Sequence, residues 1–113
     1  MTMEQHEQYE GLFVLDGEQS DEALTKAQQQ IVEQIARLGG TVERRDPWGK
    51  RRLAYRVRRR RDGFYLLVVF RIPSAAVAPL DQWCALNELI LRRLILRGAS
   101  ENAQPMEAMA SHG

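Results

Sequence analysis

The apolar residues of the chain form two kinds of pattern, short continuous runs and one long helical stripe. Residues 9–15 (YEGLFVL) suit a pleated sheet, and Asp16-Gly17 after them is a turn signal. Ser20 can cap a helix, and apolar residues then recur every three or four positions through residues 24–38. Gly39-Gly40 can end that helix, because glycine adopts the left-handed conformation without a steric penalty. A strand followed by a helix is therefore predicted.

The middle of the chain predicts a hairpin with an interrupted first strand. Residues 41–58 are expected to be extended, because apolar and charged side chains are interspersed. Pro47 has no N–H group for a central ladder, so we expect two half-strands joined at residues 46–49. Asp62-Gly63 is a hairpin signal, and it places the turn within residues 59–63.

The rest of the chain predicts a strand, a helix and a final strand. Residues 64–72 (FYLLVVFRI) carry the strongest strand signal, and Pro73 closes it. The helix is expected to begin near Pro79, since proline suits the first helical position. Residues 90–97 (ILRRLILR) form the last predicted strand. The apolar side of the second helix is expected from Leu80, Trp83, Cys84 and Leu86.

The order of these elements is strand, helix, strand, strand, helix, strand, which contains two split βαβ halves. It predicts a ferredoxin-like α+β sandwich, in which a four-stranded antiparallel sheet carries both helices on one face. A chain of 113 residues has room for one modest core. We therefore expect one domain over residues 9–97, a flexible N-terminal tail over 1–8 and a disordered C-terminal tail over 98–113.

The sheet is expected to have an apolar open face. Two helices cover only one side of a four-stranded sheet, yet the strands at residues 9–15 and 64–72 are apolar on both sides. A contiguous exposed apolar patch usually marks an interface, although a self-contained fold or a homodimer is the alternative. The predicted partner-protein surface consists of Leu12, Val14, Tyr65, Leu67, Val69 and Ile95.

The charges are strongly segregated along the chain, although the net charge is only +1. Ten of the sixteen Lys and Arg residues fall within residues 44–61, where Asp46 is the one acid. Guanidinium groups donate two hydrogen bonds at once to phosphate, so this density favours RNA contact over a merely solvated or salt-bridged face. The candidate RNA contacts are Lys50, Arg51, Arg52, Arg56, Arg58, Arg59, Arg60 and Arg61.

Three aromatic residues could stack on unpaired bases, namely Tyr9, Trp48 and Tyr65. Aromatic residues in strands more often belong to a core, so both a core position and a stacking position are considered for Tyr65. Trp48 is the better candidate, because it lies in a predicted loop beside arginines.

Catalytic, cofactor and membrane functions find little support in the sequence. Cys84 is the single cysteine, which excludes an internal disulfide and a thiolate cluster. His6 and His112 both lie in the predicted tails, and no nucleophile with a base is suggested in the folded part. No apolar run approaches the ~20 residues that a membrane span needs. We expect a cytoplasmic, non-enzymatic protein with no cofactor and no small-molecule substrate.

Residues 48–57 (WGKRRLAYRV) resemble the signature of the small-subunit ribosomal protein six family of bacterial type. The aromatic residues after Gly63 and the segment LNELILRRLILR at residues 86–97 also follow the family's order and spacing, so the resemblance spans residues 9–97. Arg56 stands where the family usually has proline. An RNA-recognition motif of the same topology is a poor match, because Leu66 occupies the place of its second aromatic residue.

The resemblance implies a structural protein of the small ribosomal subunit in the cytoplasm. Such proteins pair with ribosomal protein eighteen across the open sheet face and bind the central domain of small-subunit ribosomal RNA, which helps the platform to assemble. By the same analogy Arg93, Arg97 and Asn87 are further RNA contacts. A paralogue that acts off the ribosome, as a protein-interaction or general RNA-binding module, is the alternative.

Overall fold

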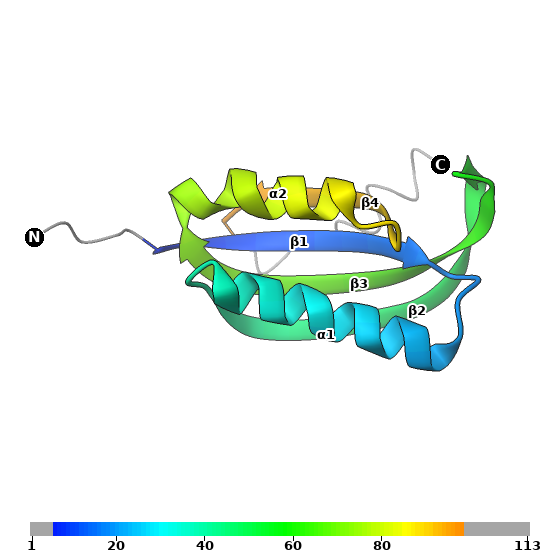
Figure 1. Ribbon diagram of the computed structural model, residues 1–113, viewed down its shortest axis with the longest axis horizontal. Coiled ribbons are helices and arrows are strands. Elements are labelled where there is room, and N and C mark those ends of the chain that lie inside the picture. Colours follow the sequence, from blue (N-terminus) through cyan, green and yellow to red (C-terminus); the bar gives the residue numbers. More distant parts are fainter. Residues whose placement is uncertain (1–5, 99–113) are drawn as a thin grey trace, which may run out of the picture.

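The computed structural model describes residues 6–98 and has the predicted order of elements. They form one antiparallel sheet in the order β2-β3-β1-β4, and both helices cover one of its faces (Figure 1). The predicted ferredoxin-like fold class is confirmed. Neither described helix is long and apolar enough to cross a membrane. The elements are β1 (His6–Asp16), α1 (Asp21–Arg37), β2 (Thr41–Val57), β3 (Arg60–Pro73), the 3-10 turn η1 (Ser74–Ala76), α2 (Val77–Leu86) and β4 (Ile90–Arg97).

The first strand is longer than predicted, because β1 begins at His6 rather than at Tyr9. Three residues assigned to the N-terminal tail therefore belong to the sheet, and Gln8 accepts a hydrogen bond from the N–H of Gly98 at 2.6 Å. The remainder of both predicted tails, residues 1–5 and 99–113, lies outside the described residues.

Both predicted ends of α1 are confirmed. The Ser20 hydroxyl accepts a hydrogen bond from the Ala23 N–H at 3.1 Å, which satisfies one of the N–H groups at the helix start. At the other end, Gly39 has a φ of 88°, and the N–H of Gly40 donates to the Ile35 carbonyl at 2.9 Å. This is the Schellman pattern that glycine permits.

The prediction of two half-strands is wrong for β2, which is one strand at the edge of the sheet. Among the described strands it pairs with β3 alone, so one side of its backbone is at the sheet edge and Pro47 is tolerated there. At the predicted break, the pairing register with β3 shifts between Pro47 and Gly49. Residues 46–49 therefore form a bulge within the strand.

The turn between β2 and β3 consists of Arg58 and Arg59, so the predicted position over residues 59–63 is wrong. Both arginines have positive φ, 49° and 68°, as a two-residue type I′ turn requires. Gly63 lies inside β3, where a Cβ atom would stand 2.6 Å from Cγ1 of Val14. Asp62-Gly63 therefore does not form the turn, and Gly63 is instead required by close packing within the sheet.

The second helix begins at Val77, two residues before the predicted start at Pro79. Proline is tolerated as the third helical residue, because N–H groups of the first turn have no partner within the helix. Leu80 and Cys84 are fully buried as predicted, whereas Leu86 is 74% exposed. The prediction that Leu86 faces the core is wrong.

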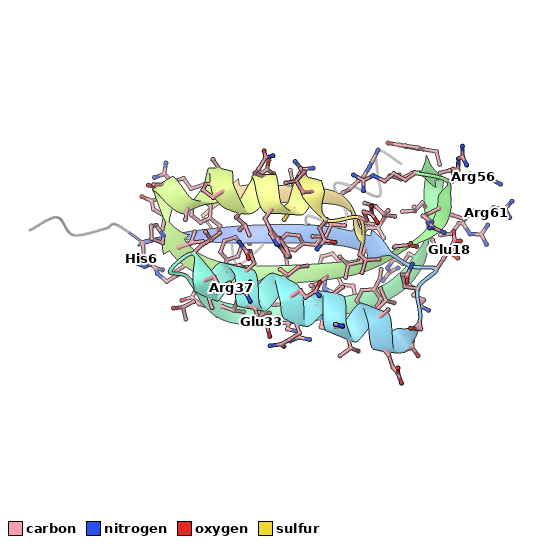
Figure 2. The ribbon with its side chains drawn as sticks, viewed as in Figure 1. His6, Glu18, Glu33, Arg37, Arg56 and Arg61 are labelled. Carbon is pink, nitrogen blue, oxygen red and sulfur yellow. The ribbon has the colours of Figure 1, made fainter. Side chains whose placement is uncertain are left out.

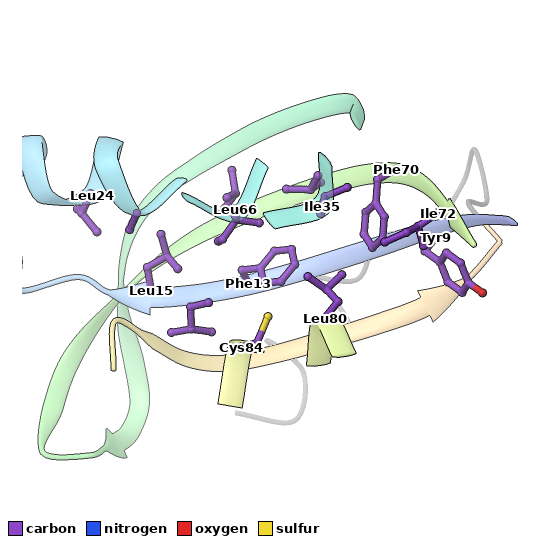
Figure 3. Packing of buried hydrophobic residues seen from close by; sticks show 14 residues of the cluster. Tyr9, Phe13, Leu15, Leu24, Ile35, Leu66, Phe70, Ile72, Leu80 and Cys84 are labelled. Carbon is purple, nitrogen blue, oxygen red and sulfur yellow. The ribbon is translucent and has the colours of Figure 1, made fainter. Parts of the chain in front are cut away.

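The core lies between the sheet and the two helices (Figure 3). Phe13 and Phe70 are fully buried at its centre, between the sheet and the helices. Tyr9 is 6% exposed and its ring stacks on Phe70, with 5.9 Å between the centroids. Tyr9 is therefore a core residue and not a stacking platform.

Candidate nucleic-acid and protein interfaces

The β2–β3 hairpin extends beyond the other strands and carries most of the predicted basic residues. β1 pairs with β3 only as far as Gly63, so the hairpin tip, residues 51–62, projects past the end of β1 (Figure 2). The arginines concerned are all exposed. Within residues 6–98 their side chains take part in no ion pair or hydrogen bond. They are Arg51, Arg56, Arg58, Arg59 and Arg61.

The remaining basic residues of this region already have acidic partners. Arg52 pairs with Asp62 at 3.0 Å, and Lys50 lies 3.6 Å from Asp21 at the start of α1. Arg60 contacts two acids, Asp16 at 3.1 Å and Glu18 at 3.6 Å. Of the eight candidates between Lys50 and Arg61, the structure thus leaves five available for a ligand.

The two arginines predicted in β4 are held by carboxylates on neighbouring elements. Arg93 donates two hydrogen bonds to Asp81 of α2, at 2.8 and 3.0 Å, and this pair lowers the pKa of Asp81. Arg97 pairs with Glu7 of β1, which lowers the pKa of that carboxyl group. Both arginines therefore contribute to holding the elements together.

Asn87 and Trp48 also have partners inside the chain. The Asn87 side chain accepts a hydrogen bond from the N–H of Leu89 at 2.9 Å, which stabilises the turn between α2 and β4. The Trp48 indole N–H donates to Asp46 at 3.0 Å, and the ring is partly buried. Neither side chain is presented freely to a ligand.

The open face of the sheet is apolar, but it is less exposed than predicted. Leu12 and Val14 are each 1% exposed, and Leu67 and Val69 are 5% and 8% exposed. The prediction of an exposed patch is therefore wrong for these four residues. Tyr65 is partly buried and packs beside Val14.

Ile95 was predicted to lie on the open face, and this is wrong. It pairs with Gly11 and packs against the core cluster on the helix side. The cause is a register shift between β1 and β4. Val14 pairs with Arg92 but Leu15 pairs with Ile90, so β4 has one extra residue there, and the alternation of faces along β4 is reversed beyond it.

Two leucines that the sequence reasoning missed supply the exposed apolar surface of the open face. Leu94 pairs with Leu12 and is 36% exposed, and Leu96 pairs with Glu10 and is 44% exposed. They alternate with Ile95 along β4. Because all three are apolar, periodicity alone could not decide which of them face the helices.

A bulge in β2, residues 53–56, folds onto the open face near the hairpin tip. The pairs Arg52–Asp62 and Val57–Arg60 flank the bulge, so four residues of β2 lie opposite a single residue of β3, Arg61. Leu53 packs in a small cluster with Val14. Tyr55 accepts a hydrogen bond from Arg92, whose guanidinium carbon lies 4.8 Å from the centroid of the tyrosine ring. No local signal in the sequence predicts this pairing of distant residues.

The described part of the chain lacks any group of three potential metal ligands. Cys84 is buried in α2, and burial raises the pKa of its thiol to about 12, so it is not a thiolate nucleophile at neutral pH.

The fold and its surface together give the class of protein. A ferredoxin-like sheet with a basic hairpin and an apolar open face is typical of a small interaction module.

The sequence model of the family described as ribosomal protein S6 matches residues 8–97. The chain belongs to this family, whose members are structural, non-enzymatic proteins of the small ribosomal subunit. The prediction of the family is therefore confirmed.

Several relatives and a solved structure agree with this assignment. The small ribosomal subunit protein bS6 of Corynebacterium aurimucosum is 39% identical over 93 residues, which cover 82% of this chain and 97% of the relative. That of Protochlamydia amoebophila is 40% identical over 89 residues, 79% of this chain and 78% of the relative. The crystal structure of 30S ribosomal protein S6 from Thermotoga maritima aligns with a TM-score of 0.77. It covers 95% of this chain and 99% of its own at 19% identity, which confirms the fold.

Proposed function

We propose that the protein binds the central domain of small-subunit ribosomal RNA together with ribosomal protein eighteen, and that it aids assembly of the platform on cytoplasmic ribosomes. The observation that carries the proposal is the group of exposed arginines on the hairpin tip that have no acidic partner among the described residues. Each can donate its planar pair of N–H groups to an RNA phosphate. The primary contacts are Arg51, Arg56, Arg58, Arg59 and Arg61.

The paired candidates rank second in this proposal. An arginine that already donates to a carboxylate must exchange that partner for a phosphate, so little is gained on binding. Arg52 and Arg60 belong to the hairpin tip, where they can make such an exchange in the complex. Arg93 and Arg97 lie on β4, outside the hairpin tip. The second rank comprises Lys50, Arg52, Arg60, Arg93, Arg97, Trp48 and Asn87.

The open face is the proposed surface for ribosomal protein eighteen. Leu94 and Leu96 expose apolar area there, whereas Leu12, Leu67 and Val69 lie on the same face but are almost fully buried. Covering the two exposed leucines removes apolar surface from water, which favours association. Tyr65 lies on the same face.

A salt-dependent titration on a central-domain RNA fragment, with and without ribosomal protein eighteen, tests both parts of the proposal. We expect tight binding only with the partner, and affinity that falls steeply as salt rises. The double variant Leu94→Asp and Leu96→Asp should lose the effect of the partner. Leu86→Asp is the matched control, because Leu86 is exposed in α2.

Two results would contradict the proposal. If the double variant still responds to ribosomal protein eighteen, the open face is not the partner surface. If the unmodified protein binds no RNA under either condition, this chain is instead a paralogue that acts off the ribosome, and the fold assignment is unaffected.

A further inference from the structure

Two acidic residues contact the hairpin tip, one at the end of β1 and one in the turn that follows it. The Arg61 backbone N–H donates to Glu18 Oε2 at 2.8 Å. Arg60 is held from two sides, with its Nε 3.1 Å from Asp16 Oδ2 and its Nη1 3.6 Å from Glu18 Oε1. Figure 2 shows Glu18 next to the tip, close to the labelled Arg61. The turn at residues 16–19 thus clamps the start of β3, directly after the two turn arginines.

The clamp is itself firmly anchored. The Asp16 side chain is 3% exposed and accepts hydrogen bonds from the Glu18 N–H and the Gln19 side chain, both at 3.0 Å. The Gly17 N–H donates to the Asp62 carbonyl at 2.9 Å, and a Cβ atom on Gly17 would stand 2.8 Å from the Asp62 carbonyl carbon. Glycine is therefore required where the turn meets the hairpin.

The position of these acids is unexpected for a surface that binds phosphate. A carboxylate beside an arginine group repels an incoming phosphate, so on charge alone Glu18 weakens RNA binding. The tip, however, projects beyond β1, and within residues 6–98 no second strand pairs with it there. Contacts from the turn therefore help to orient the tip relative to the sheet, together with the packing of Leu53 on Val14 and the contact of Tyr55 with Arg92.

We infer that Glu18 is a positioning residue for RNA binding, which fixes the hairpin tip so that Arg58, Arg59 and Arg61 reach several phosphates at once. This inference rests on the proposed function. A rigid array loses less conformational freedom on binding than three independent side chains on a mobile hairpin, so the array binds more tightly.

Two substitutions of Glu18 separate positioning from charge. Glu18→Gln and Glu18→Ala remove the same negative charge, but only glutamine keeps an oxygen that accepts the Arg61 N–H. If charge alone matters, both variants bind RNA equally and more tightly than the unmodified chain. If positioning matters, Glu18→Ala binds about five- to tenfold more weakly than Glu18→Gln.

The experiment is the salt titration of the full chain with ribosomal protein eighteen on the central-domain RNA fragment. Glu33→Ala is the control for a lost charge, because Glu33 is an exposed acid on α1, away from the tip (Figure 2). We expect the salt slope of Glu18→Ala to be lower by about one phosphate contact, and that of Glu18→Gln to be unchanged. A mere loss of stability would reduce the active fraction without changing the slope.

Amide hydrogen exchange gives a second readout that does not depend on RNA. The Arg61 amide should exchange faster in Glu18→Ala than in Glu18→Gln. Equal RNA affinity of the two variants, with the unmodified protein still binding RNA, would overturn the inference whatever the exchange rates and leave the proposed function standing. No RNA binding by the unmodified protein would overturn both.

Discussion

Two regions of this molecule carry several arginines, and these arginines differ in whether they have acidic partners. In β4, Arg93 and Arg97 are paired with Asp81 of α2 and Glu7 of β1. At the hairpin tip, Arg58 and Arg59 face no acidic side chain among residues 6–98. The difference arises because β4 runs beside other elements, whereas the tip extends past them. Packing of elements, rather than arginine content, therefore separates arginines that hold the fold from arginines that are free to bind.

The strongest test of this difference removes three tip arginines together. Changing Arg58, Arg59 and Arg61 to glutamine should lower RNA affinity on the order of 100-fold near 0.15 M salt, because about three phosphate contacts are lost. The salt slope of log K should fall by roughly three. Arg93→Gln in β4 should leave the affinity within about twofold. Titrations at several salt concentrations give both quantities, and equal losses in the two regions would remove the distinction.

A second test concerns how the tip is joined to the sheet. Gly63→Ala should lower the free energy of unfolding by about 1–3 kcal/mol, because the new Cβ would overlap the buried Val14 side chain. In a Val14→Ala background the same substitution should cost less, since the space is then open. Urea denaturation of the four proteins measures the coupling. Purely additive effects would show that the close approach at Gly63 does not matter.

The smallest expected effect concerns the β4 pair and its dependence on pH. Because the Arg93 hydrogen bonds lower the pKa of Asp81 below its usual 3.8, the ionised carboxylate favours the folded state. This contribution is present above the pKa of the unfolded chain and disappears as the pH falls through the lower folded value. With half-exposed groups it amounts to about 0.5 kcal/mol. Asp81→Asn should therefore be less stable than the unmodified protein at pH 7, and the difference should vanish in strong acid.

Local signals in the sequence were sufficient for the fold. The cap at Ser20, the stop at Gly39 and the apolar periodicity between them depend only on neighbours in the chain. Which β4 side chains face the helices depends on a register shift against β1. The turn forms at Arg58-Arg59 although Asp62-Gly63 is the stronger turn signal. These features are decided between strands rather than within one.

The candidate site was predicted in outline but not in detail. The density of arginine pointed to the hairpin, since the positions of the charged residues along the chain reveal it although the net charge does not. Which arginines are neutralised depends on acids up to tens of positions away, as with Arg60 and Asp16. Similarly, Tyr55 and Arg92 meet only because the β2 bulge folds onto the open face. Such pairings require the tertiary structure.

The irregular course of β2 has a consequence for the behaviour of the free protein in solution. As an outer strand, β2 could template the addition of a strand from another molecule, which is a route to aggregation. Pro47 and the register shifts along the strand interrupt the row of backbone groups that such an addition needs, and the charged side chains along it repel a second copy. We therefore expect the irregularity of β2, which complicates its prediction, to disfavour self-association of the free chain.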